Sequence, residues 1–237
     1  MGDPRGRVEL RTAVAEYLSR ARGARVSPDS VMITAGSRHA VEVLARMFGP
    51  THPIAVEAYG LFLFRDAITA VGGSTSPIGI DDDGAVVADL DHLDTRAVLL
   101  TPAHHYPHGV PLHPTRRSAV VDWARRTDGY VIEDDYDGEF QYGAQRTPAL
   151  CSMAHDARVL YVGSFSKSLA PALRLGYVVA PWEIMSRLLP LLCLQQLIPG
   201  QLAVAPHILF ERAAQALVAL QEFAPGERLG GSGRADI

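Results

Sequence analysis

Short apolar runs alternate with segments of helical periodicity along most of this 237-residue chain. Residues 8–21 place Leu10, Val14 and Leu18 on one helical face, and Gly23 follows as a helix stop. The same patterns predict strands at 31–34, 54–57, 97–100, 130–132 and 159–162, and helices at 37–48, 61–71 and 114–127. Strands that alternate with helices indicate an α/β fold, in which a mostly parallel sheet carries helices on both faces.

The composition is typical of a globular domain, with 48% hydrophobic residues, 20% charged residues and a net charge of −4. A chain of this length can bury one sizeable core. Because the net charge is mildly acidic and the sequence has no basic block, we expect no direct contact with nucleic acid.

The sequence shows neither a targeting signal nor a membrane span. The first seven residues are charged and lack the apolar segment of a secretory signal. The most apolar stretch, residues 188–198, is too short to span a bilayer and is interrupted by Gln195 and Gln196. Cys151 and Cys193 do not make a disulfide framework, so we expect a cytoplasmic protein without membrane contact.

Lys167 lies among hydroxyl side chains, with Ser164 and Ser166 before it and Arg174 seven residues after it. On its own, a Ser-x-Ser-Lys tetrapeptide is more often an exposed turn than a site. Here the hydroxyls and the arginine form an anion site beside a nucleophilic amine. That combination suits a Schiff base with a phosphorylated aldehyde.

A second motif, residues 130–140, is an apolar strand that ends in the acids Glu133, Asp134 and Asp135, followed by Tyr136. In an open α/β sheet the ligand lies at the carboxyl ends of the strands, so these acids are expected to face a ligand. A carboxylate that pairs with a pyridine nitrogen keeps the ring protonated and makes it an electron sink. A nearby tyrosine can hydrogen-bond the phenolic oxygen of such a ring.

Calcium is the alternative ligand for this acidic run, because Glu133, Asp135 and Asp137 imitate the start of an EF-hand loop. An EF-hand loop also needs a bidentate acid at its twelfth position. Counted from Glu133, the twelfth position is Ala144, so we do not expect calcium binding.

Together the two motifs resemble the aminotransferase-like part of the MocR-type regulators. These GntR-class transcriptional regulators fuse a winged-helix DNA-binding domain to a fold-type I, pyridoxal-phosphate-dependent aminotransferase domain. The resemblance extends from Gly2 to about Trp182, and it is also close to free-standing class I/II aminotransferases.

The resemblance implies that pyridoxal 5′-phosphate binds as an aldimine on Lys167, which is both covalent anchor and general base. Asp134 then keeps the ring nitrogen protonated, and Tyr136 approaches the ring oxygen. Tyr106 falls where class I aminotransferases place an asparagine on that oxygen, and Tyr59 matches the aromatic residue that stacks on the ring.

The resemblance also implies a phosphate site. Gly36 and Ser37 follow a predicted strand and open a helix, and backbone N–H groups at a helix N-terminus bind phosphate. Ser164, Ser166 and Arg174 are expected to complete this site.

Three histidines lie in the segment 101–109, which the family usually writes as His-Gln, an aromatic residue and Pro-Thr-Gly. His104 and His108 could share a zinc ion only on a continuous helix, which Pro107 prevents, so no metal site is expected. His105 and His108 depart from the family pattern, and we expect this departure to affect contacts with the substrate.

We expect residues 1–200 to form the large cofactor-binding domain and residues 201–237 to form a helix at 204–223 followed by a disordered tail. The resemblance implies a preceding winged-helix domain and a following small domain, which carries an arginine for the substrate carboxylate. Neither is found in this sequence, and Met1 occupies the position of a tyrosine that reaches the phosphate of the neighbouring subunit in dimeric relatives. We therefore expect the core of a larger, homodimeric protein.

Three functions remain open on this interpretation. The domain acts as an aminotransferase, or it senses an amino acid or amine for a transcriptional regulator, or it is an inactive remnant. The ligand in the first two cases is an amino acid or an amine.

Overall fold

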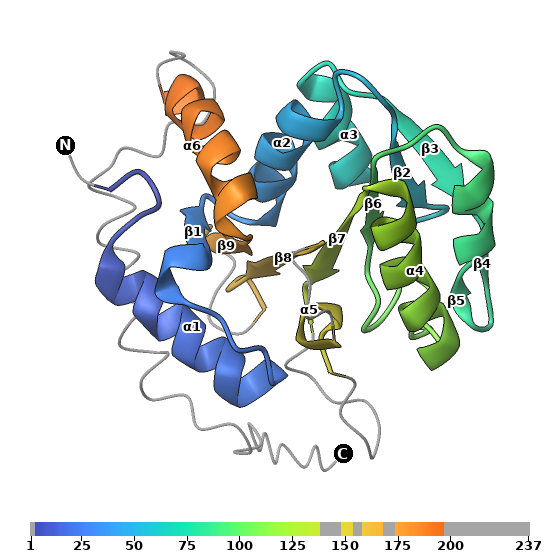
Figure 1. Cartoon of the computed structure of the whole chain (residues 1–237), viewed down its shortest axis with the longest axis horizontal. Coiled ribbons are helices and arrows are strands. Elements are labelled where there is room, and N and C mark those ends of the chain that lie inside the picture. The colour runs from blue at the N-terminus through green and yellow to red at the C-terminus, as the bar shows by residue number, and fades with distance from the viewer. Residues whose placement is uncertain (1–2, 138–147, 154–157, 168–173, 197–237) are drawn as a thin grey trace, which may run out of the picture.

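The computed structural model of the chain shows a sheet with helices on both faces (Figure 1). It describes residues 3–137, 148–153, 158–167 and 174–196. The helix and tail predicted after residue 200 lie outside the described residues, as does the predicted domain boundary.

The main sheet has seven strands in the order β1-β9-β8-β7-β6-β2-β3. They are β1 (Val31–Thr34), β2 (Ile54–Glu57), β3 (Thr75–Ile78), β6 (Ala97–Leu100), β7 (Tyr130–Asp135), β8 (Val159–Ser164) and β9 (Gly176–Val179). Neighbours from β3 to β8 pair in parallel, whereas β9 is antiparallel to both β8 and β1. The predicted α/β fold with a mostly parallel sheet is therefore confirmed.

The helical segments and a small hairpin connect these strands. They are α1 (Val8–Arg22), η1 (Pro28–Ser30), α2 (Ser37–Phe48), α3 (Phe62–Ala70), η2 (Val87–His92), α4 (Pro114–Thr127), α5 (Leu150–Met153) and α6 (Trp182–Gln196), with the hairpin strands β4 (Ile80–Asp81) and β5 (Gly84–Ala85). No helix in the described ranges is long and apolar enough to cross a membrane.

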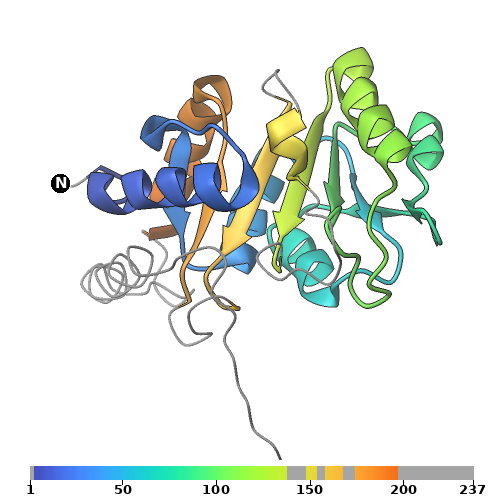
Figure 2. The same cartoon turned by 90° about the horizontal axis from the view of Figure 1, so that it is seen from below.

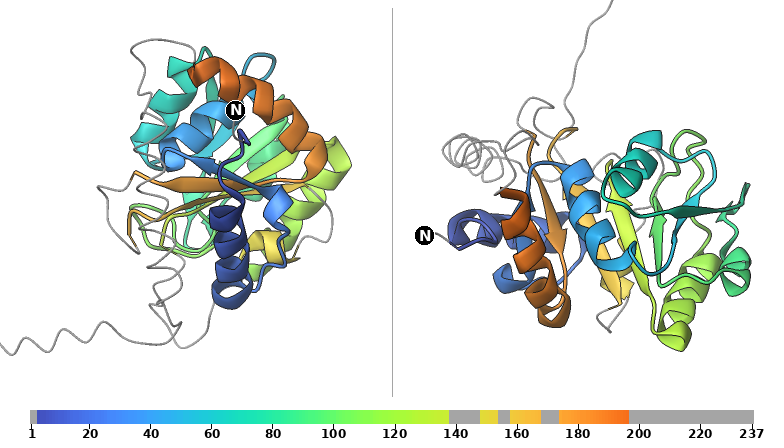
Figure 3. Two further views of the ribbon diagram at one scale, coloured as in Figure 1. Left: turned by 90° about the vertical axis from the view of Figure 1, so that its left-hand side faces the viewer. Right: turned by 90° about the horizontal axis from the view of Figure 1, so that it is seen from above.

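Helices α2, α3 and α6 pack on one face of the sheet, and α1 and α4 pack on the other. Figure 3 (right) views the molecule from the side of α2, α3 and α6, and Figure 2 views it from the opposite side, where α1 and α5 lie. Because successive strand side chains alternate in direction, Ile132 joins the α2 side of the core and Val131 joins the α4 side.

Two elements that the sequence patterns did not predict each contain a proline. Pro77 lies in β3, which is an edge strand, where a missing N–H is tolerated. Pro190 lies inside α6, although proline normally interrupts a helix. In α6, packing against the sheet outweighs the local preference of the chain.

Candidate functional site

The direction of the strands brings all the predicted site residues to one edge of the sheet. Strands β1, β2, β6, β7 and β8 end at this edge, and the antiparallel β9 begins there. At or next to these ends stand Gly36, Ser37, Tyr59, Tyr106, Asp134, Tyr136, Ser164, Ser166, Lys167 and Arg174.

The loop between β1 and α2 is held against the start of β9. Gly36 has a φ of 96°, a left-handed conformation that favours glycine. A Cβ at Gly176 would lie 2.8 Å from the carbonyl carbon of Gly36, so Gly176 needs to be glycine for this close approach. His39 Nδ1 accepts a hydrogen bond from Ala35 N at 3.0 Å and fixes the loop at the first turn of α2.

Ser164 and Ser166 lie beside this loop, because Ser164 pairs with Gly176 across the sheet. Their hydroxyl oxygens are 2.9 Å apart, and Ser166 N donates to Ser164 Oγ at 3.1 Å. Two hydroxyls and the N-terminus of α2 therefore gather in one place, as an anion site requires.

Asp134 is the least satisfied carboxyl at this edge. Its side chain is buried, and Oδ1 has no hydrogen-bond partner among the described residues. Burial, followed by the charges of Asp135, Glu57 and other nearby acids, holds the pKa of Asp134 well above its usual range. A buried carboxyl without a partner is costly, so this position suits a ligand that brings a cation or a ring N–H.

The two neighbouring acids have structural partners on the other face of the sheet. Glu133 accepts hydrogen bonds from Leu150 N at 2.7 Å and Cys151 N at 3.0 Å. Asp135 Oδ2 accepts from Arg22 Nε at 2.7 Å and from Tyr161 Oη at 2.6 Å. Because side chains alternate along β7, only Asp134 of these three acids faces the α2 side of the sheet.

This arrangement differs from a calcium loop, because Glu133 and Asp135 belong to a strand and accept hydrogen bonds from Leu150, Cys151, Arg22 and Tyr161. Within the described residues, no group of three His, Cys, Asp or Glu side chains could hold a metal ion.

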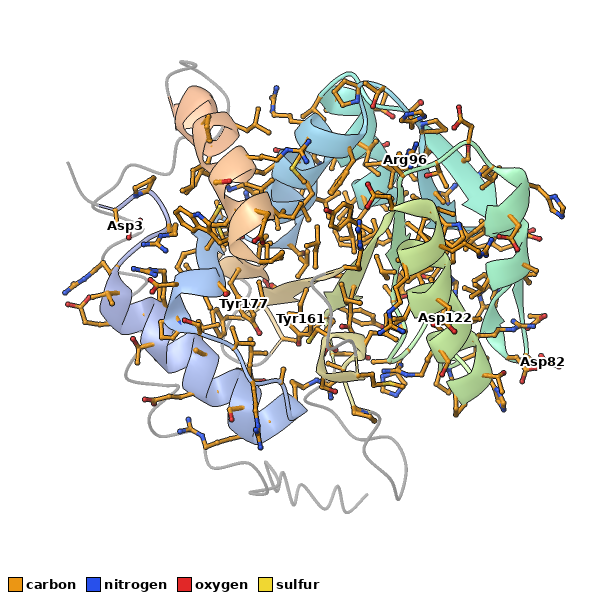
Figure 4. All side chains as sticks on the ribbon, in the orientation of Figure 1. Asp3, Asp82, Arg96, Asp122, Tyr161 and Tyr177 are labelled. Atoms are coloured by element: carbon orange, nitrogen blue, oxygen red, sulfur yellow. The ribbon has the colours of Figure 1, made fainter. Side chains whose placement is uncertain are left out.

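The Arg22–Asp135–Tyr161 network was not predicted from the sequence, and it joins α1 to β7 and β8. Figure 4 labels Tyr161 beside Tyr177, in the layer between α1 and the sheet. Tyr161→Phe removes a hydrogen bond to a buried charged group, so we expect unfolding free energy to fall by about 1.5–3 kcal/mol. Urea denaturation measures this loss.

Tyr130→Phe is the matched control for that experiment. The hydroxyl of the half-buried Tyr130 has no hydrogen-bond partner among the described residues, and its ring packs against Phe48. Equal losses in the two variants would contradict a stabilising role for the Asp135 contact.

Tyr59 and Arg174 share an unusual backbone conformation. Their φ angles are 61° and 45°, and Asp128, which ends α4, is the other non-glycine residue with a positive φ in the described ranges. Tyr59 also exposes 73% of its surface, although it is aromatic. A strained backbone and an exposed ring both cost free energy, and such features concentrate at functional sites.

The segments after β6 and β7 meet at the same edge. The rings of Tyr106 and Tyr136 are 6.5 Å apart and nearly perpendicular. His104 Nδ1 lies 3.2 Å from Asp137 Oδ1. Tyr106 and Tyr136 are therefore neighbours, as their common predicted role at a ring oxygen requires.

Lys167 follows β8 by three residues, and its side chain is exposed. Among the described residues, no carboxylate pairs with its amine.

Sequence patterns also missed a cluster of Glu57, His105 and His108 beside Tyr59. The sequence did contain one indication of this cluster, because His105 and His108 differ from the residues that the family usually has at these positions. The pattern did not show that the two rings touch, because this depends on the turn of the loop.

Comparison with known proteins identifies the family. The model of the family described as aminotransferase class I and II matches residues 1–219. The chain is 36% identical over 182 residues to the HTH-type transcriptional regulator YdeL of Bacillus subtilis. This match covers 77% of the present chain and 39% of YdeL. The chain is also 30% identical over 180 residues to the probable rhizopine catabolism regulatory protein MocR of Rhizobium meliloti. That match covers 76% of the chain and 36% of MocR. The predicted resemblance to MocR-type regulators is confirmed, and the chain spans less than two fifths of these two relatives.

Among solved structures, the kynurenine aminotransferase of Pyrococcus horikoshii in complex with PMP matches with a TM-score of 0.78 at 25% identity. The match covers 93% of this chain and 57% of that chain. By its fold and by the family match over residues 1–219, the chain belongs to the aminotransferase class I and II family.

Proposed function

We propose that this chain binds pyridoxal 5′-phosphate at the carboxyl edge of the sheet, with Lys167 as its covalent partner. The observation that carries the proposal is the buried Asp134 carboxyl, whose Oδ1 has no partner among the described residues. A protonated pyridine nitrogen would supply the missing hydrogen bond and opposite charge. The similarity to an aminotransferase crystallised with PMP supports this choice of ligand.

Each group at the edge has a part in holding the cofactor. The amides of Gly36 and Ser37, the hydroxyls of Ser164 and Ser166, and the guanidinium of Arg174 would bind the phosphate. Tyr59 would stack on the ring, and Tyr106 and Tyr136 would approach the ring oxygen.

When bound, the cofactor supplies an electron sink for charge that develops at the substrate Cα. Asp134 keeps this sink effective by accepting the hydrogen bond of the ring nitrogen. The Lys167 amine would take the proton from the substrate Cα and return it.

The activity that fits this site is amino transfer from an amino acid or amine, in a homodimer. The second candidate is the sensing of such a ligand within a transcriptional regulator, and the 36% identity to YdeL favours it. An inactive remnant is the third. The activity of the whole protein is part of the proposal, because the chain spans 39% of YdeL.

Amino donors distinguish these functions. We expect the purified chain to bind the cofactor weakly, to change its absorption spectrum when amines are added, and to turn over far more slowly than the enzyme median of about 10 per second. The test is a panel of amino acids and amines with a keto-acid acceptor. Robust turnover would establish an aminotransferase, a spectral change without turnover would favour the sensor, and neither would favour the remnant.

Tyr59 provides a test that separates function from stability. Tyr59→Gly relieves the left-handed backbone, so we expect it to be about 1 kcal/mol more stable than Tyr59→Ala. Both variants should bind the cofactor more weakly than wild type, because both lose the ring. Thermal melts and cofactor titrations measure the two effects, and unchanged affinity in both variants would exclude Tyr59 as the stacking residue.

A further inference from the structure

His105 and His108 meet edge to edge in the loop after β6. Their Nδ1 atoms are 3.1 Å apart, their ring centroids are 5.1 Å apart, and the ring planes differ by 24°. The ring centroids are farther apart than the two Nδ1 atoms, by nearly twice the distance from the centre of a ring to its edge. The nitrogens therefore point at each other, and the rings do not stack face to face. This is the geometry of a hydrogen bond between two imidazoles.

Such a contact depends on the number of protons that the two rings carry. One Nδ1 must donate and the other must accept, which is satisfied when both rings are neutral or when one is charged. When both rings are charged, two N–H groups face each other and the contact breaks.

The buried end of the pair lies against β2. His105 is 1% exposed, and its Nε2 is 4.0 Å from Glu57 Oε2. Glu57 Oε2 accepts hydrogen bonds from Thr101 N at 2.9 Å and Thr101 Oγ1 at 2.6 Å. Burial raises the pKa of Glu57 to about 7.

Protonation of His105 is unfavourable when His108 already carries a charge. Burial, and then the charge of His108, lower the pKa of His105, while the Ala58 carbonyl opposes this shift. Among the described residues, the titratable groups beside His105 are Glu57 from β2 and His108 from its own loop.

The exposed end of the pair contacts Tyr59. The rings of His108 and Tyr59 are 5.8 Å apart at 70°, an edge-to-face contact. The backbone of the loop holds His108 in place, because His105 N donates to Val110 O at 2.9 Å and Gly109 N donates to His105 O.

We propose that His105 and His108 share a proton and act as positioning residues for Tyr59, which makes ligand binding at this edge sensitive to pH. The effect on the cofactor rests on the proposed stacking role of Tyr59. Because the pKa of His105 is lowered, the contact is fully present above pH 6.5, the ordinary pKa of histidine, and is lost as the pH falls through the lowered pKa of His105.

Histidine titration by NMR tests the pair in the cofactor-free protein. We expect His108→Thr to raise the pKa of His105, since it removes the neighbouring charge. In the wild type, we expect the ring resonances of Tyr59 to shift over the same pH range as the two histidines titrate. The control is His92→Gln, which changes an exposed histidine of η2. A His105 titration that His108→Thr leaves unchanged, or Tyr59 resonances that do not follow it, would overturn the proposal.

Cofactor titrations at several pH values test the consequence. Between about pH 8 and pH 5.5, we expect wild type and His92→Gln to lose about two- to tenfold more affinity than His108→Thr, which has no pair to break. His105→Gln restores the residue usual in the family, and it should show the same flattened profile as His108→Thr. Parallel profiles in all four proteins would refute the coupling to Tyr59. If none of them binds the cofactor, the proposed function fails, and the NMR titration still decides whether the pair exists.

Discussion

Lys167→Ala is expected to lose covalent attachment of pyridoxal phosphate completely. Borohydride reduction of the loaded wild type should leave a stable label on one peptide, the one that contains Lys167. The assignment is unusually clean, because Lys167 is the only lysine among the 22 Lys and Arg residues of the sequence. The α-amino group is the only other primary amine that could react.

Lys167→Arg is the matched control. It keeps a cation at the same position but cannot form the covalent bond, so it separates attachment from simple attraction of the phosphate. We expect no label in either variant and some residual, dialysable cofactor in the arginine variant. Wild-type absorption and labelling in Lys167→Ala would refute the assignment, and peptide mass spectrometry gives the result directly.

Asp134→Asn is expected to weaken the cofactor site by about 10- to 100-fold in affinity, the equivalent of a charge-assisted hydrogen bond of roughly 1.5–3 kcal/mol. Exchange of the substrate Cα proton should fall further, because a neutral amide does not hold the ring nitrogen in its charged form. Deuterium exchange of a bound amino acid measures this step. An unchanged rate would transfer the role to another carboxylate.

The same substitution should have the opposite effect on the protein without cofactor. A carboxyl whose pKa is raised in the folded state binds more protons there than in the unfolded state, so stability falls as the pH rises through the ordinary carboxyl range and above. Asp134→Asn lacks this penalty and should melt at a higher temperature than wild type near neutral pH. Opposite shifts in stability and affinity would show that Asp134 is kept for binding, whereas a loss of both would show a structural role.

Several predictions from the sequence were accurate because they depend on neighbours along the chain. The strands at 31–34, 54–57 and 97–100 have the predicted bounds, since short apolar runs with turn signals at both ends leave little choice. The helix at 114–127 also matches, with Pro114 at its first turn. The motif around Lys167 and the acidic run identified the family without any tertiary information.

The strand predicted at 130–132 was too short, for a reason that lies elsewhere in the chain. Three consecutive acids normally end a buried strand, but β7 continues through Asp135. Glu133 is satisfied by the amides of α5, and Asp135 by Arg22, which is 113 residues away in the sequence. No local pattern contains these partners.

The sequence by itself determined the α/β fold and the family, because periodicity and motif spacing are properties of adjacent residues. Only the tertiary structure decided the partners of Glu133 and Asp135 and which histidines touch. Those outcomes depend on the extension and face of β7 and on the turn that brings His108 to His105. Burial and contacts between distant residues set them, and neither is encoded in any short segment of the chain.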